Sequence, residues 1–364
     1  MPGPDITRPK SNSPASFLFL LRYAIWLGAT VAFLAQPFSG YAEWNPSPLQ
    51  SASAQSQPPQ SQSGTTPTAP ANSSPQQPDD NGTYVIHKNV DEVLLHATVI
   101  DDKQHIVTNL DQNAFTVFED GKPQKIISFH NEDIPVSMGI VIDNSGSMRE
   151  KRSKVNAAAL NLVRASNPQD EVFVVNFNDE YYLDQDFTND LLKLKEALEK
   201  IDARGGTALR DALVASAEHL KQDAKLERKV LFVVTDGDDN ASRESLEDAV
   251  KQLQAENGPS VYAIGILGDE EHPKRARHAL EIIAQRTGGL AFFPKTLDEV
   301  DDISRQVAHD IKNQYTIGYK PTNPRVSGGF RTIRVEAKVK GRKLMVRTKS
   351  GYYAGAQPAA PGAK

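Results

Sequence analysis

The feature that most constrains the fold is a regular alternation of apolar runs and helical patterns between residues 136 and 313. The apolar runs are continuous, which is typical of strands that helices cover on both faces. This alternation predicts an α/β domain with a doubly wound, mainly parallel sheet. We expect strands at 136–142, 171–177, 229–235, 261–267 and 290–293, and helices at 148–164, 190–201, 208–223, 242–255, 276–286 and 297–313.

The segments on either side of this α/β unit, residues 83–133 and 314–354, instead have the pattern of short strands separated by turns. Each segment is too short to form a secure core alone. A domain can be inserted into another when its own termini lie close together. We therefore expect the two segments to form one small β-sandwich with the α/β domain inserted at 134–313. Two separate small sheets are the alternative.

The N-terminal residues 1–42 have the pattern of an export signal. Basic residues precede an apolar core at 23–34, and Gly40-Tyr41-Ala42 provides a small-x-small cleavage site. An uncleaved anchor is the alternative, because residues 17–35 are apolar apart from Arg22 and long enough to span a bilayer. Both interpretations place the rest of the chain outside the cytoplasm, as a secreted, periplasmic or membrane-anchored protein of the cell envelope.

Composition limits the remaining segments and the classes of function. Residues 43–82 are rich in Pro, Ser and Gln, which predicts a disordered linker, and residues 355–364 have the composition of a disordered tail. The formal net charge is −5 and no basic patch dominates, which argues against nucleic acid as a partner. The chain contains no cysteine, so a disulfide framework and thiolate chemistry are both excluded.

Three loops of the α/β unit carry oxygen-bearing side chains. Asp143, Ser145 and Ser147 follow the strand expected at 136–142, Thr207 follows two glycines, and Asp236 follows the strand expected at 229–235. In open α/β sheets, ligands bind beside the carboxyl ends of the strands. Oxygen donors suit a hard divalent cation such as Mg²⁺, and the lack of His or Cys disfavours zinc or copper.

Each of these loops also has an ordinary structural interpretation. Ser145 or Ser147 can serve as a helix N-cap, and Thr207 can cap the helix that follows it. Asp236 precedes a glycine and can belong to a solvated turn. Taken one loop at a time, these alternatives remain open.

Taken together, the three motifs resemble the von Willebrand factor A (vWA) domain with a complete metal-ion-dependent adhesion site. The resemblance covers residues 134–313. It implies that a divalent cation, Mg²⁺ or alternatively Mn²⁺ or Ca²⁺, is bound by five residues, which are Asp143, Ser145, Ser147, Thr207 and Asp236. The flanking segments resemble a bacterial vWA-related family first noted in acidobacteria, through the motifs at 115–124, 315–319 and 350–353.

The resemblance implies a metal-dependent protein-binding module, used in adhesion or as a scaffold, whose partner offers an Asp or Glu carboxylate to the metal. We do not expect an enzyme, because the motif loops contain no His general base and no Cys nucleophile. The alternatives are a structural cell-envelope module that uses the metal for stability, and a metal-assisted hydrolase. A membrane is involved only if the N-terminal anchor is left uncleaved.

Overall fold

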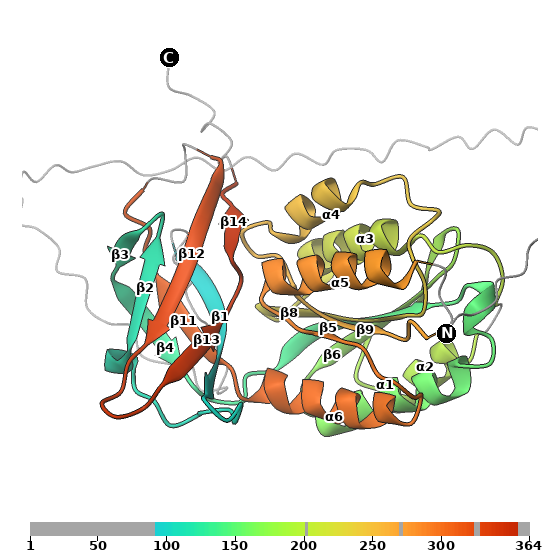
Figure 1. The fold of residues 1–364 in the computed structure, drawn as a ribbon, viewed down its shortest axis with the longest axis horizontal. Helices are drawn as coiled ribbons and strands as arrows, with labels where there is room; N and C mark the ends of the chain where they lie inside the picture. The colour runs from blue at the N-terminus through green and yellow to red at the C-terminus, as the bar shows by residue number, and fades with distance from the viewer. Residues whose placement is uncertain (1–91, 201–202, 269–271, 324–327, 356–364) are drawn as a thin grey trace, which may run out of the picture. The chain divides into compact units, whose positions relative to one another are not determined.

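The computed structural model describes residues 92–200, 203–268, 272–323 and 328–355 (Figure 1). The expected signal or anchor at 1–42, the linker at 43–82 and the tail from residue 356 onward lie outside the described residues. In the part of the chain that the structure describes, no helix has both the length and the apolar character needed to cross a membrane.

Six strands form the sheet of the α/β domain, in the order β10-β9-β8-β5-β6-β7. Strand β5 lies at the centre and pairs in parallel with both β6 and β8, whereas β7 pairs antiparallel with β6 at one edge. Every residue of β5 is buried. The six strands are β5 (Val136–Asp143), β6 (Glu171–Phe177), β7 (Tyr181–Thr188), β8 (Arg228–Thr235), β9 (Ser260–Gly265) and β10 (Ala291–Phe292).

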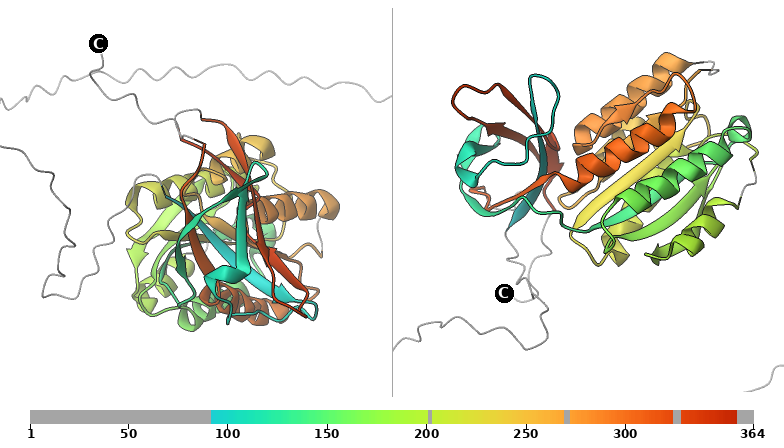
Figure 2. Two further views of the ribbon diagram at one scale, coloured as in Figure 1. Left: turned by 90° about the vertical axis from the view of Figure 1, so that its left-hand side faces the viewer. Right: turned by 90° about the horizontal axis from the view of Figure 1, so that it is seen from below.

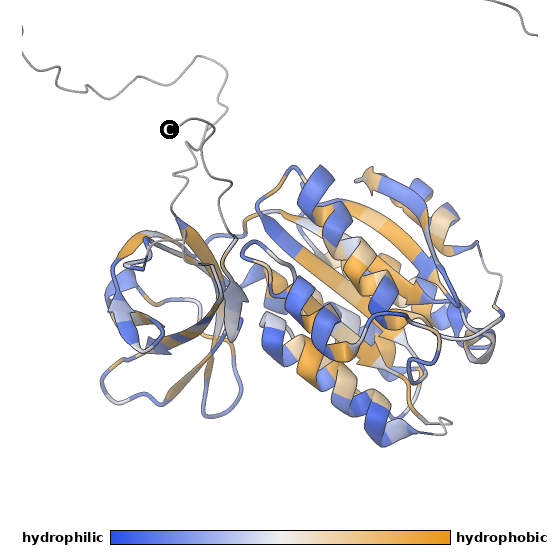
Figure 3. Cartoon of the chain, turned by 90° about the horizontal axis from the view of Figure 1, so that it is seen from above, coloured by the Kyte–Doolittle hydropathy of each residue, from blue (hydrophilic) through white to orange (hydrophobic). Residues whose placement is uncertain are grey.

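Helices cover both faces of this sheet, with α3, α4 and α5 on one face and α1, α2 and α6 on the other (Figure 1). Successive side chains of a strand point to opposite faces, so β5 contributes Ile140 and Ile142 to one core and Val141 to the other. The helices are α1 (Arg152–Ala165), α2 (Leu191–Leu198), α3 (Leu209–Asp223), α4 (Leu246–Leu253), α5 (Pro273–Thr287) and α6 (Glu299–Lys312). The apolar strands between the helices are visible in Figure 3. The expected α/β fold with a mainly parallel sheet is confirmed.

Several details of this domain differ from the expectation, and helix α4, for example, spans Leu246–Leu253 rather than 242–255. Helix α1 begins at Arg152 rather than residue 148, because residues 146–148 form the short 3₁₀ helix η2 (Gly146–Met148). Helix α5 begins earlier than expected, at Pro273, a residue type that is favoured in the first helical turn. Strand β7 was not expected, since its exposed and polar residues carry no buried-strand pattern.

The two strand-rich segments form two four-stranded sheets, with the orders β13-β1-β11-β4 and β14-β12-β2-β3. Both sheets contain strands from both ends of the chain, since β1 pairs with β11 and β13, and β2 pairs with β12. The strands are β1 (Val93–Asp101), β2 (Phe115–Glu119), β3 (Lys122–Gln124), β4 (Ile126–His130), β11 (Tyr315–Tyr319), β12 (Phe330–Ala337), β13 (Leu344–Arg347) and β14 (Gly351–Tyr353). A single apolar core combines residues of both sheets, and Figure 2 shows the strands of the two sheets lying together. One shared sandwich is therefore formed, not two separate sheets.

Candidate metal centre

Asp143 ends the central strand β5 and is fully buried. One carboxylate oxygen accepts a hydrogen bond from the Ser145 backbone N–H at 2.8 Å, and the other accepts one from the Thr235 hydroxyl at 2.5 Å. Burial raises the pKa of Asp143 to about 6, the bonds from Thr235 and Ser145 oppose this rise, and the negative charge of Asp236 adds to it. The site thus holds two neighbouring carboxylates in a buried region where a cation is electrostatically favoured.

The two serines and Asp236 lie together although they come from different loops. The hydroxyl oxygens of Ser145 and Ser147 are 3.2 Å apart, and Ser147 donates a hydrogen bond to Asp236 Oδ1 at 2.8 Å. The Ser145 and Asp236 side chains are almost entirely buried. The structure thus joins the loop after β5 to the loop after β8, the two neighbouring strands at the centre of the sheet.

Thr207 lies in the third loop, and backbone hydrogen bonds attach that loop to the other two. The Thr207 N–H donates to Asn240 Oδ1 at 2.9 Å, and the Asn240 N–H donates to the Thr207 carbonyl at 3.1 Å. The Gly146 N–H donates to the Gly205 carbonyl at 3.4 Å. The positions of the three loops are therefore coupled by direct contacts that involve their backbones.

The ordinary structural interpretations of these residues are wrong. Ser145 is at the N-cap position of η2, but within the described chain its side chain makes no capping hydrogen bond. Lys151 and Ala208, rather than Ser147 and Thr207, precede helices α1 and α3. Asp236 is 2% exposed and so does not belong to a solvated turn. The buried side chains of Ser145 and Asp236 both lie within hydrogen-bonding distance of Ser147, which is itself exposed.

Sequence reasoning missed a cation that the chain itself supplies. The Lys151 ammonium group donates to Asp236 Oδ2 at 2.5 Å. Lys151 lies in the turn just before α1, and nothing in the sequence pairs it with Asp236. Sequence reasoning also missed the roles of Thr235, which orients Asp143, and of Asn240, which holds Thr207.

The donor set fits a hard divalent cation. It consists of two carboxylates and three hydroxyls, and oxygen ligands of this kind are the ones that Mg²⁺ and Ca²⁺ prefer. Within the described ranges, no group of three or more His, Cys, Asp or Glu side chains is arranged to hold a metal ion. Metal binding at this centre would therefore depend on the hydroxyls of Ser145, Ser147 and Thr207 as much as on the carboxylates.

The central part of the α/β domain is similar to a known family. Residues 138–238 match the profile of the von Willebrand factor type A domain. The chain contains a vWA domain. The matched stretch begins within β5 and ends two residues after Asp236, so it includes all five residues of the candidate metal centre.

An uncharacterized protein of Synechocystis sp. is 25% identical over 187 residues, which are 50% of this chain and 43% of that protein. The chain thus spans less than half of the length of this curated relative. Similar solved structures include a von Willebrand factor type A protein from Catenulispora acidiphila, with 14% identity, a TM-score of 0.43, and coverage of 73% of this chain and 74% of that one. The vWF domain of the type V pili tip protein Mfa5 from Porphyromonas gingivalis has 14% identity, a TM-score of 0.40, and coverage of 49% and 97%. These identities and TM-scores are low, and the vWA domain is recognised from the family match at 138–238 instead.

Proposed function

We propose that this chain is an extracytoplasmic, metal-dependent protein-binding module, whose divalent cation holds an Asp or Glu carboxylate of a partner protein. The observation that carries the proposal is the contact between Ser147 and Asp236 at 2.8 Å, which draws two loops of the vWA domain into one partly buried cluster of oxygen atoms. The proposed location rests on the export pattern in residues 1–42.

The residues that would hold the cation are Asp143, Ser145, Ser147, Thr207 and Asp236. A bound cation would supply a Lewis-acidic positive charge. Hydroxyl groups bind a cation without neutralising it, so each hydroxyl in the set leaves more positive charge for a carboxylate from outside. Thr235 and the Ser145 backbone orient the carboxylate of Asp143, and burial strengthens the attraction between opposite charges.

Calorimetric titration of the full chain with Mg²⁺ tests the metal centre. Asp143→Ala removes one of two carboxylates, so we expect Mg²⁺ affinity to fall at least about tenfold, or ~1.4 kcal/mol. Asp298→Ala is the control, since the Asp298 side chain is 82% exposed and its contact is with Lys154. Equal affinities of the wild-type chain and Asp143→Ala would contradict the proposal.

Partner binding requires its own experiment. Immobilised chain is incubated with an envelope fraction in Mg²⁺ and then washed with EDTA. We expect bound protein to be released by EDTA from the wild-type chain and from Asp298→Ala, but none to be retained by Asp143→Ala. If the same amount of protein stays bound in EDTA, or binds to Asp143→Ala, the partner is not held through the metal.

One observation favours the alternative of a structural module. The ammonium group of Lys151 already balances the charge of Asp236, so the site has an internal cation. A structural module that uses the metal only for stability would lose thermal stability when Mg²⁺ is removed, but its partner binding would not change. The two experiments above therefore separate the structural module from the binding module.

A further inference from the structure

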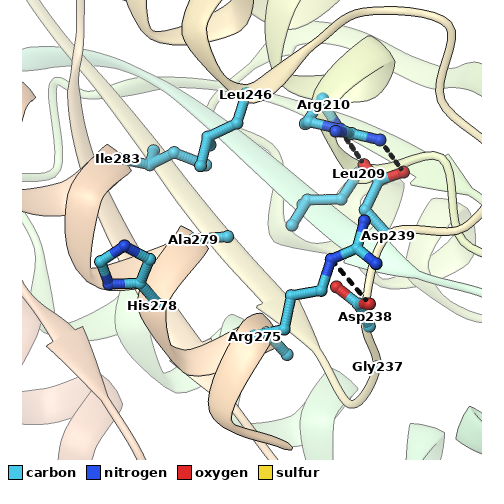
Figure 4. Close-up of a pocket in the computed structure, with 11 residues that line it drawn as sticks. Leu209, Arg210, Gly237, Asp238, Asp239, Leu246, Arg275, His278, Ala279 and Ile283 are labelled. Carbon is cyan, nitrogen blue, oxygen red and sulfur yellow. Dashed lines mark hydrogen bonds and ion pairs between the residues drawn. The ribbon is translucent and has the colours of Figure 1, made fainter. Parts of the chain in front are cut away.

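A cavity of about 130 Å³ lies between the first turn of α3, the loop after β8, and helices α4 and α5 (Figure 4). Pockets for cofactors and drug-sized ligands are larger, at roughly 300–1,000 Å³. An engineered apolar protein cavity of about 150 Å³ binds benzene. The cavity is thus of a size for a single side chain or a group no larger than one aromatic ring.

The chemistry of the lining favours an apolar occupant. Four aliphatic side chains form much of the wall, and these are Leu209, Leu246, Ala279 and Ile283. The charged residues of the lining are paired with one another. Arg210 donates to both carboxylate oxygens of Asp239 at 3.0 Å, and Arg275 lies 3.3 Å from Asp238. Since each guanidinium faces a carboxylate, little net charge is left to attract a charged group.

Two residues of the cavity lining are close in sequence to residues of the candidate metal centre. Gly237, which lines the cavity, is the residue after Asp236, and Leu209 is two residues after Thr207. Neighbouring residues of an extended peptide are separated by about 3.3–3.6 Å. A partner segment with its carboxylate at the metal centre would therefore bring side chains of nearby residues to this part of the domain.

We propose that the cavity binds a large apolar side chain, of the leucine, isoleucine or phenylalanine type, from the same partner segment that supplies the carboxylate. This inference rests on the proposed function and narrows the partner to a segment with an acidic residue and a large apolar residue a few positions away. The metal centre would supply the anchor that all acidic segments share, and the cavity would select among them.

Selection of phage-displayed random peptides tests this proposal. Peptides are bound to the immobilised full chain in Mg²⁺ and eluted with EDTA. We expect the wild-type chain to enrich peptides in which an acidic residue is followed or preceded within a few positions by a large apolar residue. Asp143→Ala is expected to yield no EDTA-eluted peptides.

Ala279→Leu fills the cavity from its α5 wall, and Gln285→Leu is the matched control. Gln285 is exposed on the same helix and does not line the cavity. We expect Ala279→Leu to keep its Mg²⁺ affinity and its preference for acidic residues but to lose the apolar preference. Its affinity for a peptide selected on the wild-type chain should fall about tenfold to a hundredfold, as expected when one buried apolar side chain is excluded. Gln285→Leu should behave as the wild-type chain does.

A variant that enlarges the cavity gives an independent result if Ala279→Leu does not fold. Leu246→Ala should shift the selected apolar residue toward larger side chains. The same apolar preference in the wild-type chain and in either cavity variant overturns the cavity proposal and leaves the proposed function intact. If the wild-type chain yields no EDTA-eluted peptides, or if Asp143→Ala yields the same ones, the proposed function itself is overturned.

Discussion

Lys151 and Ser147 share the carboxylate of Asp236 between them. The Lys151 ammonium donates to one oxygen at 2.5 Å and the Ser147 hydroxyl donates to the other at 2.8 Å. The Lys151 side chain is only 16% exposed and that of Asp236 is fully buried, so the pair is poorly screened by water. A divalent cation that approaches Asp236 therefore has to compete with this ammonium group.

Replacing Lys151 is expected to strengthen metal binding. Lys151→Gln removes the competing charge, and we predict that Mg²⁺ affinity rises about tenfold, equivalent to ~1.4 kcal/mol. Calorimetric titration measures the change. Lys154→Gln serves as the control, because Lys154 lies three residues later, in the first turn of α1, and its ion pair with Asp298 is exposed. Unchanged or weaker Mg²⁺ binding by Lys151→Gln would show that Lys151 does not compete with the metal.

Among the loops of the site, the one that carries Thr207 depends on a glycine with a left-handed backbone. Gly205 has a φ of +73°, and a Cβ atom at this position would lie 2.0 Å from Asp179 Oδ2. The same Asp179 carboxylate accepts a hydrogen bond from the Gly206 N–H at 2.8 Å. Because Gly205 has no side chain, Asp179 can approach closely and fix the path of the loop.

Gly205→Ala is predicted to displace this loop. It should lower the free energy of unfolding by about 1 kcal/mol from backbone strain, with a further loss from the contact with Asp179, and should weaken Mg²⁺ binding. Gly121→Ala is a matched control, since Gly121 has a similar φ of +77° and a Cβ atom added there would have no neighbour within 4 Å. Denaturant unfolding and Mg²⁺ titration of both variants separate the two effects. Equal losses of stability and unchanged Mg²⁺ affinity would refute the role of the Asp179 contact.

At the scale of the whole molecule, a buried polar cluster joins the two ends of the described chain. Glu119 of β2 accepts hydrogen bonds from the hydroxyls of Tyr319 and Tyr352, and it forms an ion pair with Arg331 at 3.2 Å. The side chains of Glu119 and Arg331 are each 1% exposed. The sandwich therefore depends on residues that lie on both sides of the inserted vWA domain in the sequence.

Glu119→Ala is predicted to destabilise the sandwich by about 3–5 kcal/mol, because it leaves the buried guanidinium of Arg331 without its carboxylate. Glu336→Ala, on strand β12, is the control and should cost less than about 1 kcal/mol, since its partners Arg334 and Lys338 are exposed. Chemical denaturation measures the free energy of unfolding of both variants. Similar losses for the two variants would show that the buried cluster contributes no more than a surface pair.

Lys349 gives the molecule a pH dependence that can be tested. Burial lowers the pKa of Lys349 from its ordinary value of 10.5 to about 8, although its ammonium donates to the Glu256 carbonyl at 2.7 Å. The unfolded chain therefore binds more protons than the folded chain between these pH values, and this lysine's contribution to stability rises with pH there. The free energy of unfolding of the wild-type chain, relative to Lys349→Met, should increase between about pH 8 and pH 10. The exposed Lys343, replaced by Met, should show no such difference.

The sequence by itself determined the class of fold and the chemistry of the candidate site. The continuous apolar run before Asp143 predicted a fully buried strand, and β5 is fully buried because it lies at the centre of the sheet with helices on both faces. The three oxygen-bearing motifs could be recognised because each follows a strand or begins a helix, positions that local patterns indicate well. The strand patterns at both ends likewise indicated one sandwich.

Only the tertiary structure decided which groups meet. Lys151 and Asp236 are 85 residues apart in the sequence, and no local pattern relates them. Thr235 was visible only as the end of a strand until the pairing of β5 and β8 brought its hydroxyl to Asp143. Strand β7 exists through its pairing with β6 at the sheet edge, where exposed residues carry no apolar signal. Contacts of this kind depend on strand order and loop path, and these are set by packing across the whole domain.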